Sequence, residues 1–358
     1  MFAERFVRAR KASGLSMQAL ADKVGLSANA IKKYEHGDAM PSSSNLMKLS
    51  KALNVRSEYF FRPTKIEVEG IEYRKRASIS QKILNKIRSD VLDQAERWYE
   101  LLDLFPDSAK PIANFELPQD LPESITDYEE IDSVADCMRE HWQLGLNPVQ
   151  DMVDTFESRG LMVILTYIET DKKFDGLAGT IKEQPLIVIS GSQAGDRQRF
   201  TLAHELGHLV LRDRLANSID EEKACDRFAG AFLLPTSAVK RELGEKRSQL
   251  ESRELYMLKG EYGISMAGIT IRAQQCRIIT SGYYAHVMRY FSKQGWRKQE
   301  PGDAYPSEQT FLFKQLVYRA LSEEYIGESK AAELLGMSLA SFHKERKLEV
   351  TGDSTTTC

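Results

Sequence analysis

The chain of 358 residues has no long apolar run, and its four cysteines are scattered. No segment approaches the roughly 20 consecutive apolar residues that a membrane-spanning helix needs, and the first residues are charged, unlike a secretory signal. The cysteines show no C-x-x-C pairing, which argues against a disulfide framework and against a cysteine-type zinc finger. Hydrophobic residues make up 42% of the chain, enough for two or three packed domains. We therefore expect a globular, cytoplasmic protein with buried free thiols.

The chain also has little net charge, but its charge is unevenly distributed. The formal net charge is −3. Residues 1–62 contain 11 Lys and Arg against 5 Asp and Glu, a net of +6, which leaves −9 for the rest of the chain. A basic head on an acidic body predicts that the head binds a polyanion.

The basic head shows the pattern of two short helices joined by a tight turn. Ser16 caps the first helix, Gly25 makes the turn, and Ser27 caps a second helix that ends at Gly37. Apolar residues are spaced to pack the two helices at a steep angle, as in a helix-turn-helix; they are Ala21, Val24, Leu26 and Ile31. The pattern L-S-x-x-x-L-A-x-x-x-G-L-S-x-x-x-I-x-x-x-E-x-G resembles the Xre/Cro-like repressor family of DNA-binding domains, with the resemblance covering residues 2–62.

In such domains the second helix enters the major groove of DNA. The residues expected to face DNA are Ala28, Asn29, Lys32 and Lys33, with Gln18 on the preceding helix. Asn29 can pair with adenine and Lys33 can reach guanine, while phosphate contacts are expected from Arg8, Arg10, Lys11 and Lys23. Met17 stands where the family often has a phosphate-anchoring Gln. The alternative is a dimerisation or protein-binding module of the same fold.

A second motif, His204-Glu205-Leu206-Gly207-His208, lies far downstream of the head. Apolar neighbours at helical spacing place it on a helix, with both histidines on one face and only Gly207 unfavourable to helix. Two imidazoles suit zinc, and a catalytic zinc takes three protein ligands and keeps one position open for water. Glu205 points toward that open position, where a carboxylate can act as general base. The alternative is a chance match on a helix packed in an ordinary core.

The next predicted helix supplies a candidate third ligand. Residues 218–221 read as a capping box that begins this helix, which ends at Pro235. Glu222 and Asp226 stand one turn apart on it. Glu222 would complete the coordination, and Asp226 would accept the free ring N–H of a ligating histidine. The alternative is a solvated acidic first turn that suits the helix dipole.

The runs R-x-R-F-T-x-A-H-E-L-G-H-L and E-x-x-C-D-x-F-A-x-x-x-L-x-P resemble the ImmA/IrrE family of bacterial zinc metallopeptidases, whose order of elements is matched over about residues 131–235. The resemblance implies that His204, His208 and Glu222 bind Zn²⁺ and that Glu205 is the catalytic acid and base. Cys225 stands where the family usually has Ala, and Arg212 where a further His often follows. Neither belongs to the expected ligand set.

We predict an α+β, mostly helical fold with a small sheet. Its expected parts are an all-α helix-turn-helix domain (1–62), a connector with a long helix and a Pro-rich linker (63–124), a zincin-like peptidase domain (125–240) and a mainly helical C-terminal region (241–358). The connector should hold an extended hairpin at 63–76 and a long helix at 78–105. The apolar stripe of that helix packs within the chain or forms a dimer seam.

Strands are expected at 161–167 and 186–190, beside the metal helices, and at 278–290. Within the last of these, Tyr283, Tyr284 and His286 are candidates for a proton donor to the tetrahedral oxyanion, although packing is the simpler role. Residues 331–342 echo the Gly-Leu-Ser step of the head and form either a second helix-turn-helix or a plain helical hairpin.

The two motifs together predict a bacterial or phage regulator that binds a double-stranded operator and hydrolyses a peptide bond. The resemblance implies that the substrate is an Xre-type repressor or an antitoxin, cut in a stress, prophage or mobile-element response, with single-stranded DNA as an activator; a homodimer is also considered. Two other classes stay open: a transcription factor with a structural or sensory zinc domain, and a toxin-antitoxin component acting by contact alone. Glu205 favours the enzyme, because a structural site does not need it.

Overall fold

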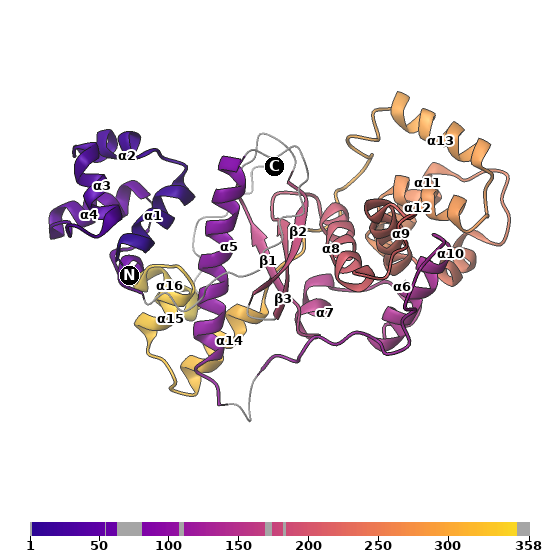
Figure 1. The fold of residues 1–358 in the computed structure, drawn as a ribbon. Coiled ribbons are helices and arrows are strands. Elements are labelled where there is room, and N and C mark those ends of the chain that lie inside the picture. The colour runs from indigo at the N-terminus through magenta and orange to yellow at the C-terminus, as the bar shows by residue number, and fades with distance from the viewer. Residues whose placement is uncertain are drawn as a thin grey trace. The chain divides into compact units, whose positions relative to one another are not determined.

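The computed structural model describes residues 2–53, 55–62, 81–106, 111–168, 174–181 and 184–348 (Figure 1). These residues divide into two compact units. The first unit combines the described residues before 68, between 80 and 113, and after 309, and the second contains those from 114 to 309. The expected hairpin at 63–76 lies outside the described residues, and the four-part division predicted from sequence stays a prediction.

The first unit begins with a small all-helical domain. Its elements are α1 (Phe2–Ser13), α2 (Met17–Val24), α3 (Ala28–His36), α4 (Ser43–Leu53) and the 3₁₀ helix η1 (Ser57–Phe61). The predicted caps are confirmed, because Ser16 accepts a hydrogen bond from the Ala19 amide and Ser27 accepts one from the Ala30 amide. Gly25 adopts a left-handed conformation (φ 69°), which glycine reaches without a Cβ penalty. The core of this domain consists of fully buried side chains from each helix, among them Phe6, Leu20, Ile31, Leu49 and Phe60.

Four further helices complete the first unit. They are α5 (Gln81–Leu102), α14 (Leu312–Ser322), α15 (Glu328–Leu334) and α16 (Leu339–Arg346). The predicted apolar stripe of α5 is buried within the chain at Val91, Ala95 and Trp98. This helix packs against α1 and α14, and the Trp98 and Phe313 rings lie 5.1 Å apart. Residues more than 200 positions apart in the sequence therefore share one core.

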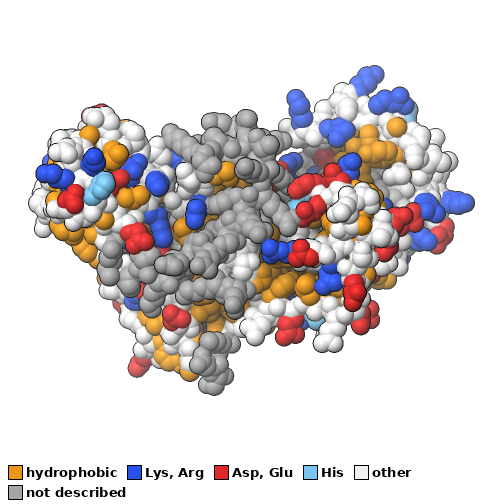
Figure 2. All heavy atoms as spheres, in the orientation of Figure 1, with side chains coloured by type: hydrophobic (Ala, Val, Ile, Leu, Met, Phe, Trp, Pro, Cys, Tyr) orange, Lys and Arg blue, Asp and Glu red, His pale blue; other side chains and the backbone are white. Residues whose placement is uncertain are grey.

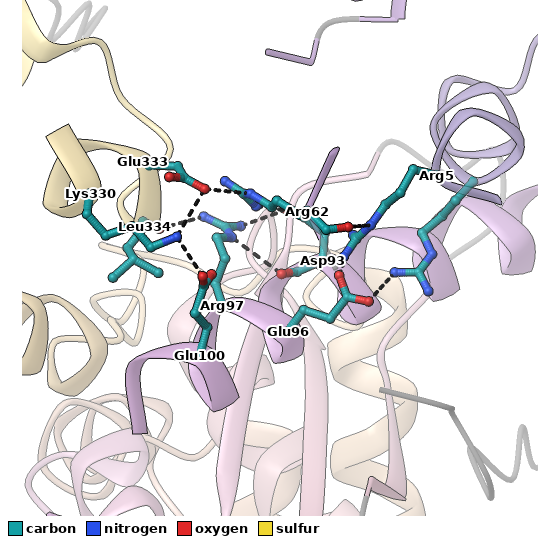
Figure 3. A network of polar contacts seen from close by, with 10 residues as sticks. Arg5, Arg62, Asp93, Glu96, Arg97, Glu100, Lys330, Glu333 and Leu334 are labelled. Atoms are coloured by element: carbon teal, nitrogen blue, oxygen red, sulfur yellow. Dashed lines mark hydrogen bonds and ion pairs between the residues drawn. The ribbon is translucent and has the colours of Figure 1, made fainter. Parts of the chain in front are cut away.

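Polar contacts also join these segments (Figure 3). Glu96 of α5 accepts hydrogen bonds from the buried Arg5 and, at 2.6 Å, from Arg8, both on α1. Arg62 forms an ion pair at 2.7 Å with Glu333 of α15. Each charge in this partly buried network has an opposite partner, as removal from water requires.

The second unit places helices around a three-stranded sheet of the described residues (Figure 1). The strands are β1 (Met162–Thr166), β2 (Gly176–Ile181) and β3 (Gln184–Ser190), in the order β1-β3-β2. Strand β3 pairs in parallel with β1 and antiparallel with β2. The helices are α6 (Glu130–His141), α7 (Met152–Glu157), α8 (Gly195–Leu211), α9 (Glu221–Leu233), α10 (Thr236–Leu243), α11 (Ser252–Tyr262), α12 (Met266–Gln275) and α13 (Ser281–Lys293). The predicted α+β, mostly helical class and the strands at 161–167 and 186–190 are confirmed.

The strand predicted at 278–290 is wrong. Thr280 caps helix α13 by accepting from the Tyr283 amide, and the helix buries Val287, Met288 and Phe291. Ile278, Ile279 and the tyrosines have β-sheet propensity, but burial at helical spacing decides the structure. The start of α9 was also misplaced by two residues: Asp220, and not Ser218, is its N-cap and accepts from the Lys223 amide.

Within the described residues, no helix combines the length and the low polarity that crossing a bilayer demands. Three of the cysteines, Cys137, Cys225 and Cys276, are free thiols there, and Cys225 is buried. Cys137 and Cys276 are half-buried, so the expected burial holds for Cys225 and not for these two.

Candidate functional site

Helices α8 and α9 form the centre of the second unit and carry the predicted metal-binding residues. His204, Glu205 and His208 are buried on α8. A Cβ at Gly207 would lie 3.2 Å from the Phe228 ring and 3.3 Å from the Cα of Cys225, both on α9. The absence of a side chain at Gly207 therefore permits the close approach of the two helices, which offsets its poor helix propensity.

The structure brings His204, His208 and Glu222 together. The Nε2 atom of His204 lies 3.5 Å from one carboxylate oxygen of Glu222, and the Nε2 atom of His208 lies 3.6 Å from the other. One ligand atom from each of the three residues lies within 4.8 Å of the others. Tetrahedral zinc with ligand bonds of about 2 Å separates its donor atoms by about 3.3 Å. The donor types and their spacing therefore fit a divalent metal such as zinc.

The other ring nitrogens of the two histidines also meet carboxylates. The Nδ1 atom of His204 lies 2.8 Å from Asp226, as the sequence predicted, and the Nδ1 atom of His208 lies 3.0 Å from Glu221. A carboxylate only accepts, so each Nδ1 donates its proton and leaves the Nε2 lone pair available. The sequence interpretation missed Glu221, which it assigned to a helix cap. The sequence signal that could have identified Glu221 is its position one turn before Cys225. The Sγ atom of Cys225 lies 3.4 Å from the same Nδ1 atom of His208.

The histidine and carboxylate side chains of this cluster differ in their exposure to solvent. Both histidine side chains are less than a tenth exposed, whereas the side chains of Glu222 and Asp226 are 57% and 61% exposed. Figure 2 shows acidic side chains gathered on the surface over this part of the second unit. The cluster is thus open to solvent on its α9 side.

Glu205 lies beside the first residue of strand β2. A Cβ at Gly176 would meet the Glu205 carboxylate at 3.3 Å, the Thr201 methyl group at 2.5 Å and the Val188 carbonyl oxygen at 2.9 Å. Only glycine fits this close approach of strand and helix. The sheet therefore holds the Glu205 side chain in place next to the two histidines of its own helix.

A buried ion pair fixes the first half of α8. The Arg199 guanidinium contacts the Glu308 carboxylate at 2.8 Å, and Glu308 also accepts from the amides of Met152 and Val153. Burial raises the pKa of Glu308, and the charge of Arg199 opposes that rise without cancelling it. This contact ties the segment after α13 to the helix that carries the histidines.

The structure places the three predicted proton donors, Tyr283, Tyr284 and His286, on α13, and Tyr283 has another partner. The Tyr283 hydroxyl accepts a hydrogen bond from the Leu250 amide at 2.8 Å and donates to the Leu250 carbonyl oxygen. Tyr283 is thus bound to the backbone before α11, which supports the packing role for this residue.

The structure exposes most of the predicted DNA-facing side chains of the head. Asn29, Lys32 and Lys33 of α3 are exposed, as is Gln18, which donates to Asp22 at 2.8 Å, while Ala28 is half-buried. Two of the four predicted phosphate contacts are instead engaged within the protein: Arg8 pairs with Glu96 and Arg10 with Glu35. Lys11 and Lys23 remain exposed.

Comparison with known families assigns both regions. Residues 8–60 match the family model described as helix-turn-helix, and residues 158–274 match that of the IrrE N-terminal-like domain. The chain joins a helix-turn-helix domain to an IrrE N-terminal-like domain. The second of these is a metallopeptidase family.

Two curated relatives resemble the head. The chain is 38% identical over 52 residues to the cryptic phage CTXphi transcriptional repressor RstR of Vibrio cholerae, covering 14% of this chain and 46% of the repressor. It is also 38% identical over 64 residues to the SPbeta prophage-derived uncharacterized HTH-type transcriptional regulator YonR of Bacillus subtilis, covering 18% of this chain and 59% of YonR. The chain thus spans about half the length of the curated relatives it matches.

Proposed function

We propose that this protein is a transcription regulator that binds double-stranded DNA through α3 and hydrolyses a peptide bond at a zinc site. The observation that carries the peptidase proposal is the arrangement of His204 and His208. Their Nε2 atoms face the Glu222 carboxylate, and their Nδ1 atoms are held by Asp226 and Glu221. If the acidic first turn of α9 only interacted with solvent, it would not need two imidazole rings oriented by carboxylates.

His204, His208 and Glu222 would hold the metal, leaving its fourth position open. A zinc ion bound there supplies Lewis acidity, which polarises a carbonyl group and acidifies water. Glu205 accepts the proton of the attacking water and then donates it to the nitrogen of the departing amine. Its buried position next to Gly176 keeps this carboxylate oriented between the two transfers.

Strand β2 is suited to bind the substrate. It lies at one edge of the sheet of described strands and begins at Gly176, beside Glu205. An extended peptide can add to such an edge through backbone hydrogen bonds, which bind many sequences with little dependence on side chains. We infer that the scissile peptide runs along β2, so that the bond to be cleaved lies beside Glu205.

We propose a repressor or an antitoxin of the Xre type as the substrate. The head of this chain is similar to a phage transcriptional repressor and to a prophage-derived transcriptional regulator. A regulator that removes such a protein would switch on the genes that the protein silences.

For the head, α3 is the helix proposed to enter the major groove. Asn29, Lys32 and Lys33 are exposed on it, and an amide and two cations suit base edges and phosphates. Lys11 and Lys23 are exposed as well, whereas Arg8 pairs with Glu96 of α5 and Arg10 with Glu35.

The test is incubation of the purified full chain, loaded with zinc, with the Xre-type repressor encoded beside its gene, with and without single-stranded DNA. We expect cleavage by the wild type and none by Glu205→Gln. Glu245→Gln is the matched control, because it makes the same chemical change at an exposed glutamate of the same unit. Cleavage that persists in Glu205→Gln would contradict the assigned base. If neither protein cleaves while both bind zinc and promoter DNA, the structural or sensory zinc domain becomes the better account.

A further inference from the structure

Besides Gly14-Leu15-Ser16 between α1 and α2, the same helix-glycine-x-serine-helix step occurs three times within the described residues. The first is Gly25-Leu26-Ser27 between α2 and α3, in the head. The second is Gly263-Ile264-Ser265 between α11 and α12, and the third is Gly336-Met337-Ser338 between α15 and α16. The first belongs to the domain proposed to bind DNA, so we compared the other two with it.

The first and third steps have the same local geometry. Gly25 and Gly336 both have a φ of +69°. The amide that follows each glycine donates to the carbonyl five residues earlier at 3.0 Å, Leu26 to Ala21 and Met337 to Ala332. Each serine then caps the next helix by accepting from the amide three residues on, at 3.1 Å in the first step and 3.0 Å in the third. The first and third steps therefore share one type of backbone turn.

The buried positions also correspond, with a constant offset along the chain. Leu20, Ala21 and Ile31 of the first step are buried, and so are their equivalents Ala331, Ala332 and Phe342. The Tyr318 ring of α14 stacks on Phe342 at 5.8 Å, whereas Phe6 of α1 meets the ring of Tyr34 edge-on at 6.2 Å. Helices α14–α16 thus form a small three-helix core around the turn.

The outward faces of the two second helices match as well. On α3 this face presents Asn29, Lys32, Lys33 and His36, all exposed. The equivalent exposed residues are Ala340, His343 and Lys344 of α16 and Lys347, the C-cap of that helix. Glu328 pairs with His343 and Arg346. Among the described residues, no carboxylate pairs with Lys344 or Lys347. Two cations one turn apart therefore point outward without compensation.

The second step, Gly263-Ile264-Ser265, shows that the turn alone does not produce an exposed basic helix face. Gly263 and Ser265 repeat the backbone geometry, but Met266, Ile269, Thr270 and Ala273 of α12 are buried in the core of the second unit. The residue equivalent to Lys33 is Ile271. Helix α12 therefore serves packing, whereas α3 and α16 are both exposed and basic.

The third step is anchored to the head domain in the same unit (Figure 3). Arg56 donates to the Met337 carbonyl oxygen inside the turn, and Arg97 of α5 donates to the Leu334 carbonyl oxygen at 3.1 Å. Together with the Arg62–Glu333 pair, these contacts hold α15 against the elements that carry α3. The spacing between α3 and α16 is thus set by the protein.

We propose that α15 and α16 form a second helix-turn-helix that contacts double-stranded DNA through Lys344 and Lys347. One chain then contacts two segments of its operator. This proposal rests on the proposed DNA binding by α3. Ala340 lacks the amide that Asn29 offers, so the second contact is mainly to phosphates and adds affinity more than base discrimination. A single chain then covers a longer site than one helix-turn-helix reads.

The experiment uses the full chain and duplexes that it selects from a library with a random core. Affinity is measured over a series of salt concentrations, and the bound site is mapped by hydroxyl-radical footprinting. The variants are Lys344→Glu with Lys347→Glu, the same pair changed to Gln, and Lys33→Glu. Lys293→Glu with Lys298→Glu, at exposed lysines of the second unit, is the charge-matched control. Far-UV circular dichroism checks that each variant is folded.

We expect both double variants at 344 and 347 to bind roughly tenfold to a hundredfold more weakly and to lower the salt slope by about 2, as the loss of two phosphate contacts predicts. Their footprint should shrink to the segment read by α3, while the control stays like the wild type. Wild-type affinity, slope and footprint in these variants, with binding lost in Lys33→Glu, would overturn the second contact and leave the proposed function standing. Absence of duplex binding by the wild type would overturn both.

Discussion

The Nδ1 atom of His204 lies 2.8 Å from the Asp226 carboxylate, one turn of α9 beyond Glu222. This bond turns the Nε2 atom of the same ring toward Glu222, at 3.5 Å. A single carboxylate thus determines which nitrogen of His204 faces the cluster.

Replacing Asp226 should weaken metal binding without removing a ligand. In Asp226→Asn the charge that orients His204 is lost, so we expect the zinc affinity to fall by about 10- to 100-fold. Titration calorimetry of the metal-free protein measures this change. Asp213→Asn is the control, because Asp213 is 94% exposed, its nearest ion-pair distance is 3.9 Å, and Asn tolerates its positive φ. Equal zinc affinity in all three proteins would contradict the role of Asp226.

The approach of β2 to α8 should not tolerate a side chain at Gly176. A methyl group there would lie 2.5 Å from Thr201 and 2.9 Å from a carbonyl oxygen. We expect Gly176→Ala to lower the free energy of unfolding by about 1–3 kcal/mol and to reduce cleavage, since Glu205 is displaced. Gly260→Ala, in α11 with no atom within 4 Å of the added methyl group, should be neutral or stabilising. Thermal unfolding compares the two, and equal effects would contradict the packing argument.

The buried charges of the first unit depend on Glu96. The Arg5 residue is only 1% exposed, and Glu96 accepts from both Arg5 and Arg8. Because Glu96→Ala leaves a buried guanidinium without its partner, we expect a loss of about 3–5 kcal/mol of stability. Glu323→Ala breaks a solvent-exposed pair with Arg319 and should change stability far less than Glu96→Ala, because water screens the pair. Urea unfolding followed by circular dichroism distinguishes these outcomes, and a small effect at Glu96 would refute its structural role.

Asp132 should make the second unit sensitive to acid. Burial raises the pKa of this carboxyl, but Arg272 at 3.1 Å and Arg227 at 2.7 Å outweigh burial, and its net pKa is lowered. A carboxyl with a lowered folded-state pKa contributes stability that is fully present above its unfolded value of about 3.9. This contribution is lost as the pH falls through the folded-state pKa. Asp132→Asn should therefore destabilise at neutral pH and differ less from the wild type below about pH 4. A difference in melting temperature that stays constant with pH would contradict this assignment.

Local patterns in the sequence were sufficient to predict the helix-turn-helix of the head and the juxtaposition of His204, His208 and Glu222, the proposed metal ligands. The caps made by Ser16 and Ser27 and the turn at Gly25 involve only residues a few positions away in the chain. Their roles therefore follow from the local sequence. The spacing of His204 and His208 also determines their shared face once a helix is assumed. Glu221 was missed because a carboxylate in a first helical turn has a sufficient local explanation.

Features that depend on distant segments were not predicted. Helix α13 was taken for a strand, because tyrosine and isoleucine favour strands locally while the burial of Phe291 is a tertiary fact. The grouping of α14–α16 with the head depends on contacts such as that between Arg62 and Glu333, 271 positions apart. Glycine has a low helix propensity, so Gly207 looked unfavourable to helix. The reason for a glycine there is the close packing of α9, which the sequence of α8 does not reveal.

The most direct test of the account is the zinc content of the purified chain and two of its variants, measured by elemental analysis after gel filtration. We predict one zinc ion per chain in the wild type and in Glu205→Gln, and little or none in Glu222→Ala, because Glu222 is proposed as a ligand and Glu205 as the base. Full retention of zinc in Glu222→Ala, or its loss in Glu205→Gln, would contradict the assignment of these two glutamates.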